Sequence, residues 1–354
     1  MLFEQFVQQR NISNRTSKSY KLAITKYEDY NEMTIDELIR EAEEEEENSI
    51  RWKKRTLRKR LIGFRNEMYN TTLSSSAKTY MQRVTTFYRH FEVELQPLPP
   101  ISKHVHTPEP IIYEDIPTRE LLQKVINESK NKTFTTIIYF MTSSGLSMVD
   151  TLDLTMKDFL DACNVKTIQE LDDIDDDFVP TFHLKRRKTN KYFYTFITPE
   201  ATQEVVNYLK SREELTLDSK LFKISRDYLY KSFHKTNKKL GLGTKNKASL
   251  FRSHMLRKFH ATTLLNSGLS MEQVDSLQGR SKNKVHQSYF LDDPNHMKKK
   301  YMEHMTDLII FGDSDRILEL EKSNKEYEVR ISEQERLLQE IVEAQEKLEK
   351  LLEL

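Results

Sequence analysis

Four side chains suited to catalysis, His254, Arg257, Arg280 and Tyr289, lie within residues 253–290. Histidine transfers protons near neutral pH, arginine binds anionic oxygens through paired N–H groups, and tyrosine can act as a nucleophile. His254 and Arg257 are three positions apart, so on a helix they share one face. One short part of the chain therefore carries acid–base, anion-binding and nucleophilic groups.

Three short helices are predicted to position these groups. Ser253 is expected to be the N-cap of the first helix, because its hydroxyl can accept from an unpaired backbone N–H. Ser270 and Gln273 have the spacing of a capping box for the second helix, which is expected to stop at Gly279. Ser281 opens a third helix, which carries the tyrosine.

The pattern His254-Met-Leu-Arg257, then Gly279-Arg280, then Tyr289, resembles the C-terminal signature of the tyrosine recombinases, which include phage-type integrases and Xer-like resolvases. The resemblance implies that the Tyr289 hydroxyl attacks a DNA phosphodiester, forming a 3′-phosphotyrosyl bond and freeing a 5′-hydroxyl. Arg257 and Arg280 would stabilise charge on the phosphate oxygens, and His254 would assist as an acid–base or hydrogen-bonding group. This chemistry needs no metal and no cofactor.

One catalytic box departs from the family pattern. Residues 142–159 resemble the first box of the family, and Gly145 and Asp150 fit its positions. Ser147, however, occupies the place of the first catalytic arginine. The chain thus resembles an archaeal-like variant, and we expect Arg280, where most members have histidine, to supply the second positive charge.

A β-hairpin is predicted over residues 180–198, where aromatic and β-branched side chains alternate with polar ones. Lys188 lies near the predicted turn, and the resemblance makes it the lysine that protonates the leaving 5′-oxygen. Lys185 and Lys191 are less favoured for that role. The alternative is a solvated lysine-rich turn without a catalytic function.

The composition favours several helical parts. The chain has 354 residues, of which 37% are hydrophobic and 31% charged, with only seven glycines. A single cysteine, Cys163, excludes an internal disulfide and a cysteine-based metal cluster. No run reaches the roughly 18 apolar residues of a membrane span, and Met1 opens no signal-peptide pattern. A cytoplasmic location is therefore expected, with no membrane association.

Residues 1–97 are predicted to form four to five helices, which resembles the core-DNA-binding domain of the recombinases. A basic stretch between Arg51 and Arg60 follows a run of glutamates. Its side chains are expected to contact DNA phosphates, which position a protein on DNA without reading sequence. The candidate contacts are Arg51, Lys53, Lys54, Arg55, Arg58 and Lys59. The alternative is a solvated helix face that balances the glutamates.

Prolines mark the next boundary. Six of the nine prolines lie between Pro97 and Pro117, and no helix tolerates that density. Residues 98–117 are therefore expected to be a linker, followed by a catalytic domain over 118–312.

The C-terminal tail, residues 313–354, has a heptad pattern in which eight of the eleven a and d positions are apolar. This predicts a coiled coil, and the alternative is a single helix packed on the catalytic domain. The tail has 13 acidic and 7 basic residues, so residues 1–312 carry a net charge of +7. Such an excess of positive charge suits a nucleic-acid-binding protein.

These patterns together predict a mainly α fold with a small antiparallel β-sheet, and the resemblance implies a site-specific DNA recombinase of a phage or mobile element. Its expected partners are double-stranded DNA and further copies of the chain, as a tetramer on paired sites, with self-association of the coiled coil an additional option. A different class of function is a catalytically impaired member that binds DNA or a partner, which Ser147 favours. A type IB topoisomerase is less favoured, because the coiled coil indicates assembly.

Overall fold

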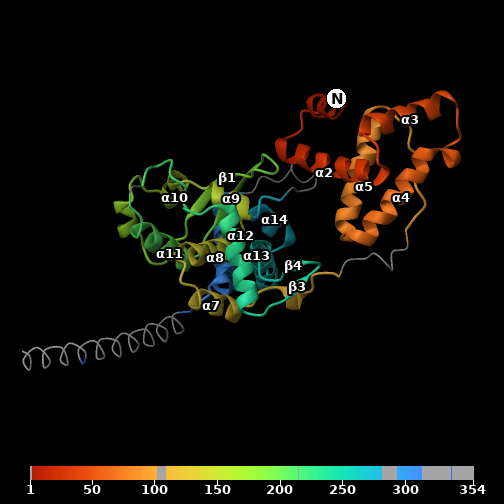
Figure 1. The fold of residues 1–354 in the computed structure, drawn as a ribbon. Helices are drawn as coiled ribbons and strands as arrows, with labels where there is room; N and C mark the ends of the chain where they lie inside the picture. The colour runs from red at the N-terminus through yellow and green to blue at the C-terminus, as the bar shows by residue number, and fades with distance from the viewer. Residues whose placement is uncertain (1, 102–108, 214, 281–292, 313–335, 337–354) are drawn as a thin grey trace, which may run out of the picture. The chain divides into compact units, whose positions relative to one another are not determined.

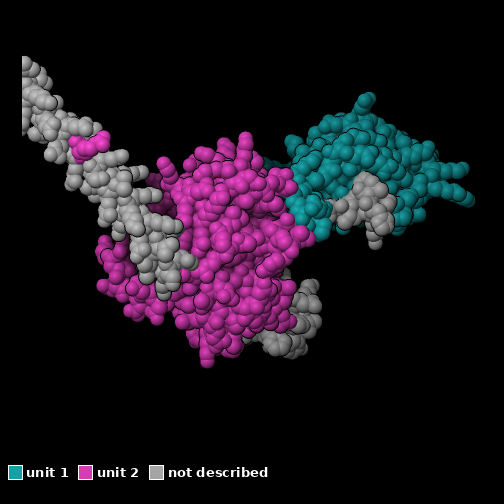
Figure 2. Space-filling model, turned by 90° about the horizontal axis from the view of Figure 1, so that it is seen from below, with its two compact units in different colours: residues 1–111, 245–247 teal, residues 112–244, 248–354 magenta. Residues whose placement is uncertain are grey.

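The computed structural model describes residues 2–101, 109–213, 215–280, 293–312 and 336 (Figure 1). Contacts between Cα atoms divide the chain into two compact units (Figure 2). The first unit comprises residues 1–111 and 245–247, and the second comprises 112–244 and 248–354. Each unit has its own hydrophobic core.

The described part of the first unit is helical up to residue 90. Its elements are α1 (Leu2–Gln9), α2 (Asn14–Asn31), α3 (Ile35–Glu47), the 3₁₀ turn η1 (Trp52–Lys54), α4 (Thr56–Thr71) and α5 (Ser74–His90). Helix α3 begins with a capping box, in which Thr34 and Glu37 each accept from the other's backbone N–H. In the core, the rings of Tyr27 and Phe64 lie edge to face with centroids 5.0 Å apart, and the Tyr88 hydroxyl donates to that of Tyr27. Aromatic packing thus holds α2, α4 and α5 together.

The second unit is mainly helical, with two small antiparallel sheets. Its helices are α7 (Arg119–Asn127), α8 (Lys132–Ser144), α9 (Met148–Asp153), α10 (Met156–Cys163), α11 (Pro199–Lys210), α12 (Arg226–Lys239), α13 (Ser253–Ser267), α14 (Met271–Leu277) and α16 (Pro294–His304), with 3₁₀ turns η2 (Tyr113–Asp115), η3 (Gln169–Asp173) and η4 (Met305–Leu308). The strands are β1 (Thr181–Lys185), β2 (Tyr192–Phe196), β3 (Thr244–Lys245) and β4 (Ala248–Ser249), of which only Lys245, the last residue of β3, is counted in the first unit. The predicted mainly α fold with a small antiparallel sheet is confirmed.

Helix α8 lies at the centre of the second unit. Every residue from Phe134 to Ser144 is buried, and the helix packs against both α11 and α13. A helix that is covered on all sides must be uncharged along its length, and this one has no charged side chain after Lys132. Its C-terminal end, at Gly145, therefore reaches the inside of the unit.

Two of the predicted helix starts can be compared with the structure. The capping box of α14 is confirmed, because Ser270 accepts from Gln273 N and the Gln273 side chain accepts from Ser270 N. The predicted N-cap role of Ser253 is wrong. The N-cap of α13 is Arg252, which makes no side-chain cap bond, and Ser253 is already helical.

The predicted hairpin is present, with Thr181 paired to Phe196 and Lys185 to Tyr192. The third predicted helix, with Tyr289, and the coiled-coil tail lie outside the described residues, apart from Arg336. Within the described ranges, no helix combines the length and the apolar character needed to span a membrane.

Candidate active site

Among the predicted catalytic groups that the structure describes, Arg257 on α13 is the most buried, with 5% of its surface exposed. Its Nη1 donates to the Gly145 carbonyl oxygen at 2.5 Å and its Nη2 to the Gln278 carbonyl oxygen at 2.7 Å. Burial, followed by the positive charges of Arg186 and Arg280, lowers the pKa of Arg257 to about 9. The guanidinium thus remains charged at neutral pH, and two carbonyl groups fix its plane.

Gly145, after α8, is required at its position for two reasons. Its φ is +64°, and a Cβ atom there would lie 2.5 Å from Nδ1 of His260. His260 is fully buried, and its Nδ1 lies 3.0 Å from Nε2 of Gln278. Burial lowers the pKa of His260 to about 3, so the ring is neutral. This packing joins the end of α8 to α13 and to the residue after α14.

Gln278 is a positioning residue that the sequence patterns did not indicate. Gln278 is fully buried, and its side-chain Nε2 donates to the Arg257 backbone carbonyl oxygen at 3.0 Å. The backbone carbonyl oxygen of Gln278 accepts from the Arg257 guanidinium. Its place directly before Gly279-Arg280 was the available signal in the sequence. Gln278 therefore contacts both the backbone and the guanidinium of Arg257.

The β1–β2 hairpin brings a second guanidinium to this site. Nη1 of Arg186 donates to the Gly279 carbonyl oxygen at 2.6 Å. The next residue, Arg187, donates from its backbone N–H to Asp150 Oδ1 at 3.2 Å and pairs through Nη1 with Asp153 Oδ2 at 2.6 Å. The start of the hairpin turn is therefore attached to α9 and to the turn after α14. No sequence pattern indicated Arg186, although it lies in the same basic run as Lys188.

Lys188, the predicted general acid, is exposed in the turn of residues 187–189. Lys185 is also exposed, and its Nζ lies 5.5 Å from the centre of the Tyr192 ring. The turn thus carries the lysine that the sequence favoured, close in the chain to Arg186.

Ser147 acts as a helix cap at the position of the missing arginine. It is the N-cap of α9, where its Oγ accepts from Asp150 N and donates to Asp150 Oδ2 at 2.7 Å. The same carboxylate accepts from the Arg187 N–H through its other oxygen. Ser147 thus orients the carboxylate that holds the hairpin.

Two further predicted groups lie on the α13–α14 side of the site. His254, in the first turn of α13, has a pKa that partial burial lowers, with further contributions from Lys258 and Arg252, so its neutral form is favoured. Arg280 pairs with Asp275 at 3.0 Å and is partly exposed. The charge of Arg280 is therefore already partly balanced within the chain.

Tyr289 lies outside the described residues, whereas the next tyrosine along the chain, Tyr301, lies within them. Tyr301, on α16, is fully buried, and its hydroxyl donates to the Ser143 carbonyl oxygen at 2.9 Å. Burial raises its pKa above the ordinary value. A buried hydroxyl with a raised pKa cannot reach or attack a DNA phosphate, so Tyr301 is a core residue.

A protein-family model described as the phage integrase family matches residues 117–296, just over half of the chain. The protein belongs to the phage integrase family. The match includes Ser147, the β1–β2 hairpin and the segment from His254 to Tyr289. No curated protein shows a significant sequence match.

Solved structures show that this integrase-family chain has the fold of tyrosine recombinases. A lambda integrase dimer bound to a COC′ core site is 13% identical with a TM-score of 0.54, and the alignment covers 82% of this chain and 95% of that one. The XerH recombinase in a post-cleavage complex with a palindromic difH substrate is 18% identical with a TM-score of 0.53, covering 82% and 80%. The Tn1549 transposon integrase in complex with transposon right-end DNA is 14% identical with a TM-score of 0.52, covering 85% and 97%.

The basic stretch in the first unit of this integrase-family protein divides into two groups. Arg55 is buried, pairs with Glu46 at 2.7 Å and donates to the Ile50 carbonyl oxygen. Arg60 pairs with Glu41 at 2.7 Å. The other candidate contacts are exposed or half-buried: Arg51, Lys53, Lys54, Arg58 and Lys59. Two arginines of the stretch are therefore ion-paired with glutamates, and one of them, Arg55, is among the candidate DNA contacts.

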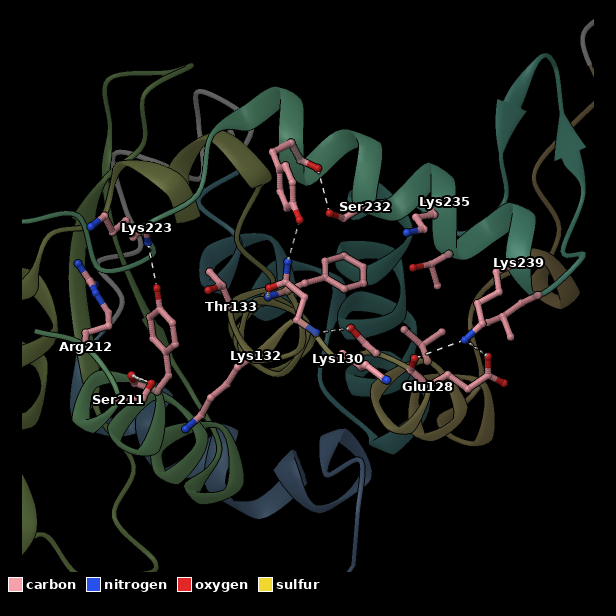
Figure 3. Close-up of a pocket in the computed structure, with 18 residues that line it drawn as sticks. Glu128, Lys130, Lys132, Thr133, Ser211, Arg212, Lys223, Ser232, Lys235 and Lys239 are labelled. Carbon is pink, nitrogen blue, oxygen red and sulfur yellow. Dashed lines mark hydrogen bonds and ion pairs between the residues drawn. The ribbon is translucent and has the colours of Figure 1, made fainter.

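A cavity of about 900 Å³ in the second unit is separate from the Arg257 site (Figure 3). It is bordered by α12, by the loop between α7 and α8, and by the end of α11. Its positively charged lining residues are Lys130, Lys132, Arg212, Lys223, Lys235 and Lys239. Lys239 is paired with Glu128 at 2.9 Å. His254, Arg257, Arg280 and Lys188, the predicted catalytic residues that the structure describes, do not line this cavity. The candidate active site is therefore the one around Arg257.

Proposed function

We propose that the protein is a site-specific DNA recombinase that cuts and rejoins strands through a 3′-phosphotyrosyl bond on Tyr289. The observation that supports this most is the fixed, buried guanidinium of Arg257. It has no ion-pair partner among the described residues, and a charged group held in this way is suited to bind an anionic oxygen.

The proposed roles follow from the chemistry of each group. The Tyr289 oxygen forms a bond to phosphorus while the bond to the 5′-oxygen breaks. Arg257 stabilises the charge that develops on the non-bridging oxygens. Lys188 gives a proton to the leaving 5′-oxygen, and His254 acts as the neutral acid–base partner. No step uses a metal or cofactor.

Double-stranded DNA and further copies of the chain are the proposed partners. The related structures include a lambda integrase tetramer bound to a Holliday junction, which is 14% identical with a TM-score of 0.52. A phosphotyrosyl bond conserves the energy of the phosphodiester, so a 5′-hydroxyl from a second strand can reverse the step. Four protomers on two DNA duplexes would allow that exchange, and the tail would add coiled-coil contacts between protomers.

A second candidate function is a recombinase fold that binds DNA or a partner without strand exchange. Ser147 favours it, because this residue caps α9 and carries no positive charge. Losing one hydrogen-bonding group at a transition state costs about 100-fold or more in rate.

A covalent-capture experiment separates the two functions. Duplexes that bind the full-length protein are first selected from a random library, and DNA flanking the coding gene is tested in parallel. Each bound sequence is then made as a suicide substrate, with a nick that lets the cleaved end diffuse away. The recombinase is expected to form a denaturant-resistant adduct that peptide mapping places on Tyr289. Specific DNA binding without an adduct on any selected sequence would instead support the DNA-binding candidate.

A further inference from the structure

We propose that Arg186 supplies the second phosphate-binding guanidinium of this active site and so replaces the arginine that the family places at position 147. This inference rests on the proposed recombinase function. It gives a catalytic role to the residue that directly follows β1 and precedes the hairpin turn.

The first support is the position of the Arg186 and Arg257 guanidiniums on one turn. Nη2 of Arg257 donates to the Gln278 carbonyl oxygen at 2.7 Å, and Nη1 of Arg186 donates to the Gly279 carbonyl oxygen at 2.6 Å. These two carbonyl groups belong to successive residues, so the two positive charges are held next to each other by one short piece of backbone.

The second support is how the chain holds the hairpin in place. Asp150 accepts from Ser147 Oγ through one carboxylate oxygen and from the Arg187 N–H through the other. Ser147 thereby orients the group that anchors the residue next to Arg186. Serine at position 147 lacks the guanidinium of the family arginine. It helps instead to hold the hairpin that carries the Arg186 guanidinium.

The third support is the balance of charge. The positive charge of Arg186 contributes more than that of Arg280 to lowering the pKa of Arg257. Arg280 has Asp275 as its ion-pair partner, whereas Arg186 and Arg257 bond only to neutral carbonyls among the described residues. The Nε of Arg186 is buried and has no hydrogen-bond partner there. Asp150 and Asp275 offset part of the charge at Arg257 without pairing with it directly. The two adjacent guanidiniums therefore still repel each other, and an anion between them relieves that cost.

The reaction step balances with Arg186 as a purely electrostatic group. The Tyr289 oxygen bonds to phosphorus, and its proton passes to His254. The bond between phosphorus and the 5′-oxygen breaks, and Lys188 gives that oxygen a proton. Arg186 and Arg257 keep their protons throughout and bind the non-bridging oxygens, whose negative charge grows in the transition state.

The test compares Arg186→Ala and Arg186→Lys with the matched control Arg187→Ala, all in the full chain and with circular dichroism to check folding. On a suicide substrate, Arg186→Ala is expected to slow adduct formation by about 100-fold, with little change in DNA affinity. Arg187→Ala should lose far less rate, because its backbone N–H bond to Asp150 is retained and only the solvent-exposed ion pair with Asp153 is lost. Adding Ser147→Arg to Arg186→Ala should restore part of the rate.

Two further measurements separate an electrostatic role from a structural one. A methylphosphonate at the scissile position lacks one charged oxygen, so the rate penalty of Arg186→Ala should shrink on that substrate. Titration with inorganic phosphate, followed through the arginine Nε resonances, should show weaker binding in Arg186→Ala than in Arg187→Ala. Equal phosphate affinity in these two variants, or equal adduct rates, would overturn the role of Arg186. A parent protein that binds phosphate through Arg186 but never forms an adduct would refute the recombinase function alone.

Discussion

The Arg257 guanidinium donates to the carbonyl oxygen of Gly145, a residue 112 positions earlier in the chain. The same glycine leaves room for the His260 ring, one helical turn after Arg257 on α13. The backbone carbonyl at the end of α8 therefore fixes the guanidinium of Arg257, the proposed catalytic arginine. The missing side chain of Gly145 leaves the space that the buried His260 ring fills. This double contact explains why glycine stands at position 145 in this chain.

Gly145→Ala is predicted to be much more destabilising than Gly241→Ala. The two residues have almost the same φ, +64° and +63°, but only at Gly145 would a Cβ atom meet another group. The left-handed backbone costs both variants a similar amount, and overpacking against His260 adds about 1–3 kcal/mol for Gly145 alone. Urea unfolding measures the difference. Equal losses in the two variants would show that the contact with His260 has no energetic weight.

Tyr289→Phe is predicted to abolish the covalent adduct and to leave DNA affinity largely unchanged, because the ring and its packing surface remain. Gel shift and denaturing electrophoresis on the same suicide duplex measure binding and cleavage. An adduct that persists in this variant would refute the assignment of Tyr289 as the nucleophile.

Tyr301→Phe is the matched comparison and should behave in the opposite way. Its hydroxyl is buried and hydrogen-bonded to Ser143, so its removal is expected to lower the free energy of unfolding by about 1 kcal/mol. Adduct formation by the folded protein should be retained. Loss of cleavage with unchanged stability would contradict the assignment of Tyr301 to the core.

The sequence predicted the local features of the site better than its long-range contacts. The capping box at Ser270 and the hairpin over 180–198 depend on neighbouring residues, so their patterns can be read directly. The bond from Arg186 to Gly279 joins residues 93 positions apart, and no periodicity encodes it. Arg55 illustrates the same limit, because its burial depends on how α3 and α4 pack.

Replacing Arg51, Lys53 and Lys54 with glutamine is predicted to weaken binding to all DNA sequences. Each lost phosphate contact should reduce the slope of log K against log salt by about 0.9. These side chains are exposed, so folding should be unaffected. Binding titrations between low and moderate salt, on specific and random duplexes, give the slope. An unchanged slope would assign the stretch to a solvated surface.

Arg55→Gln is the matched control within the same stretch. It removes the ion pair with Glu46 and the bond to the Ile50 carbonyl oxygen, so a loss of about 2 kcal/mol in unfolding free energy is expected. The salt slope of DNA binding should not change. A reduced salt slope with an unchanged free energy of unfolding would show that Arg55 contacts DNA.

His260 is predicted to make the second unit sensitive to mild acid. Its pKa is about 3 in the folded protein and 6.5 as the ordinary value, because burial disfavours the charged ring. The unfolded state therefore binds more protons between these values, and stability rises with pH in that window. Above pH 6.5 the ring is neutral in both states, so it does not reduce the free energy of unfolding. As the pH falls toward 3, the unfolded state takes up the proton and the free energy of unfolding decreases. At pH 5 the loss relative to pH 7.5 amounts to about 2 kcal/mol.

His260→Gln isolates this effect, because glutamine can keep a hydrogen bond with Gln278 but does not titrate. Urea unfolding at pH 7.5 and at pH 5 should show that the parent loses about 2 kcal/mol more than this variant. All other titrating groups are the same in both proteins, so they cancel in the comparison. His296→Gln, at an exposed position on α16, should follow the parent at both pH values. Parallel losses in the parent and His260→Gln would mean that the ring is protonated in the folded protein, and the neutral histidine packed against Gly145 would have to be abandoned.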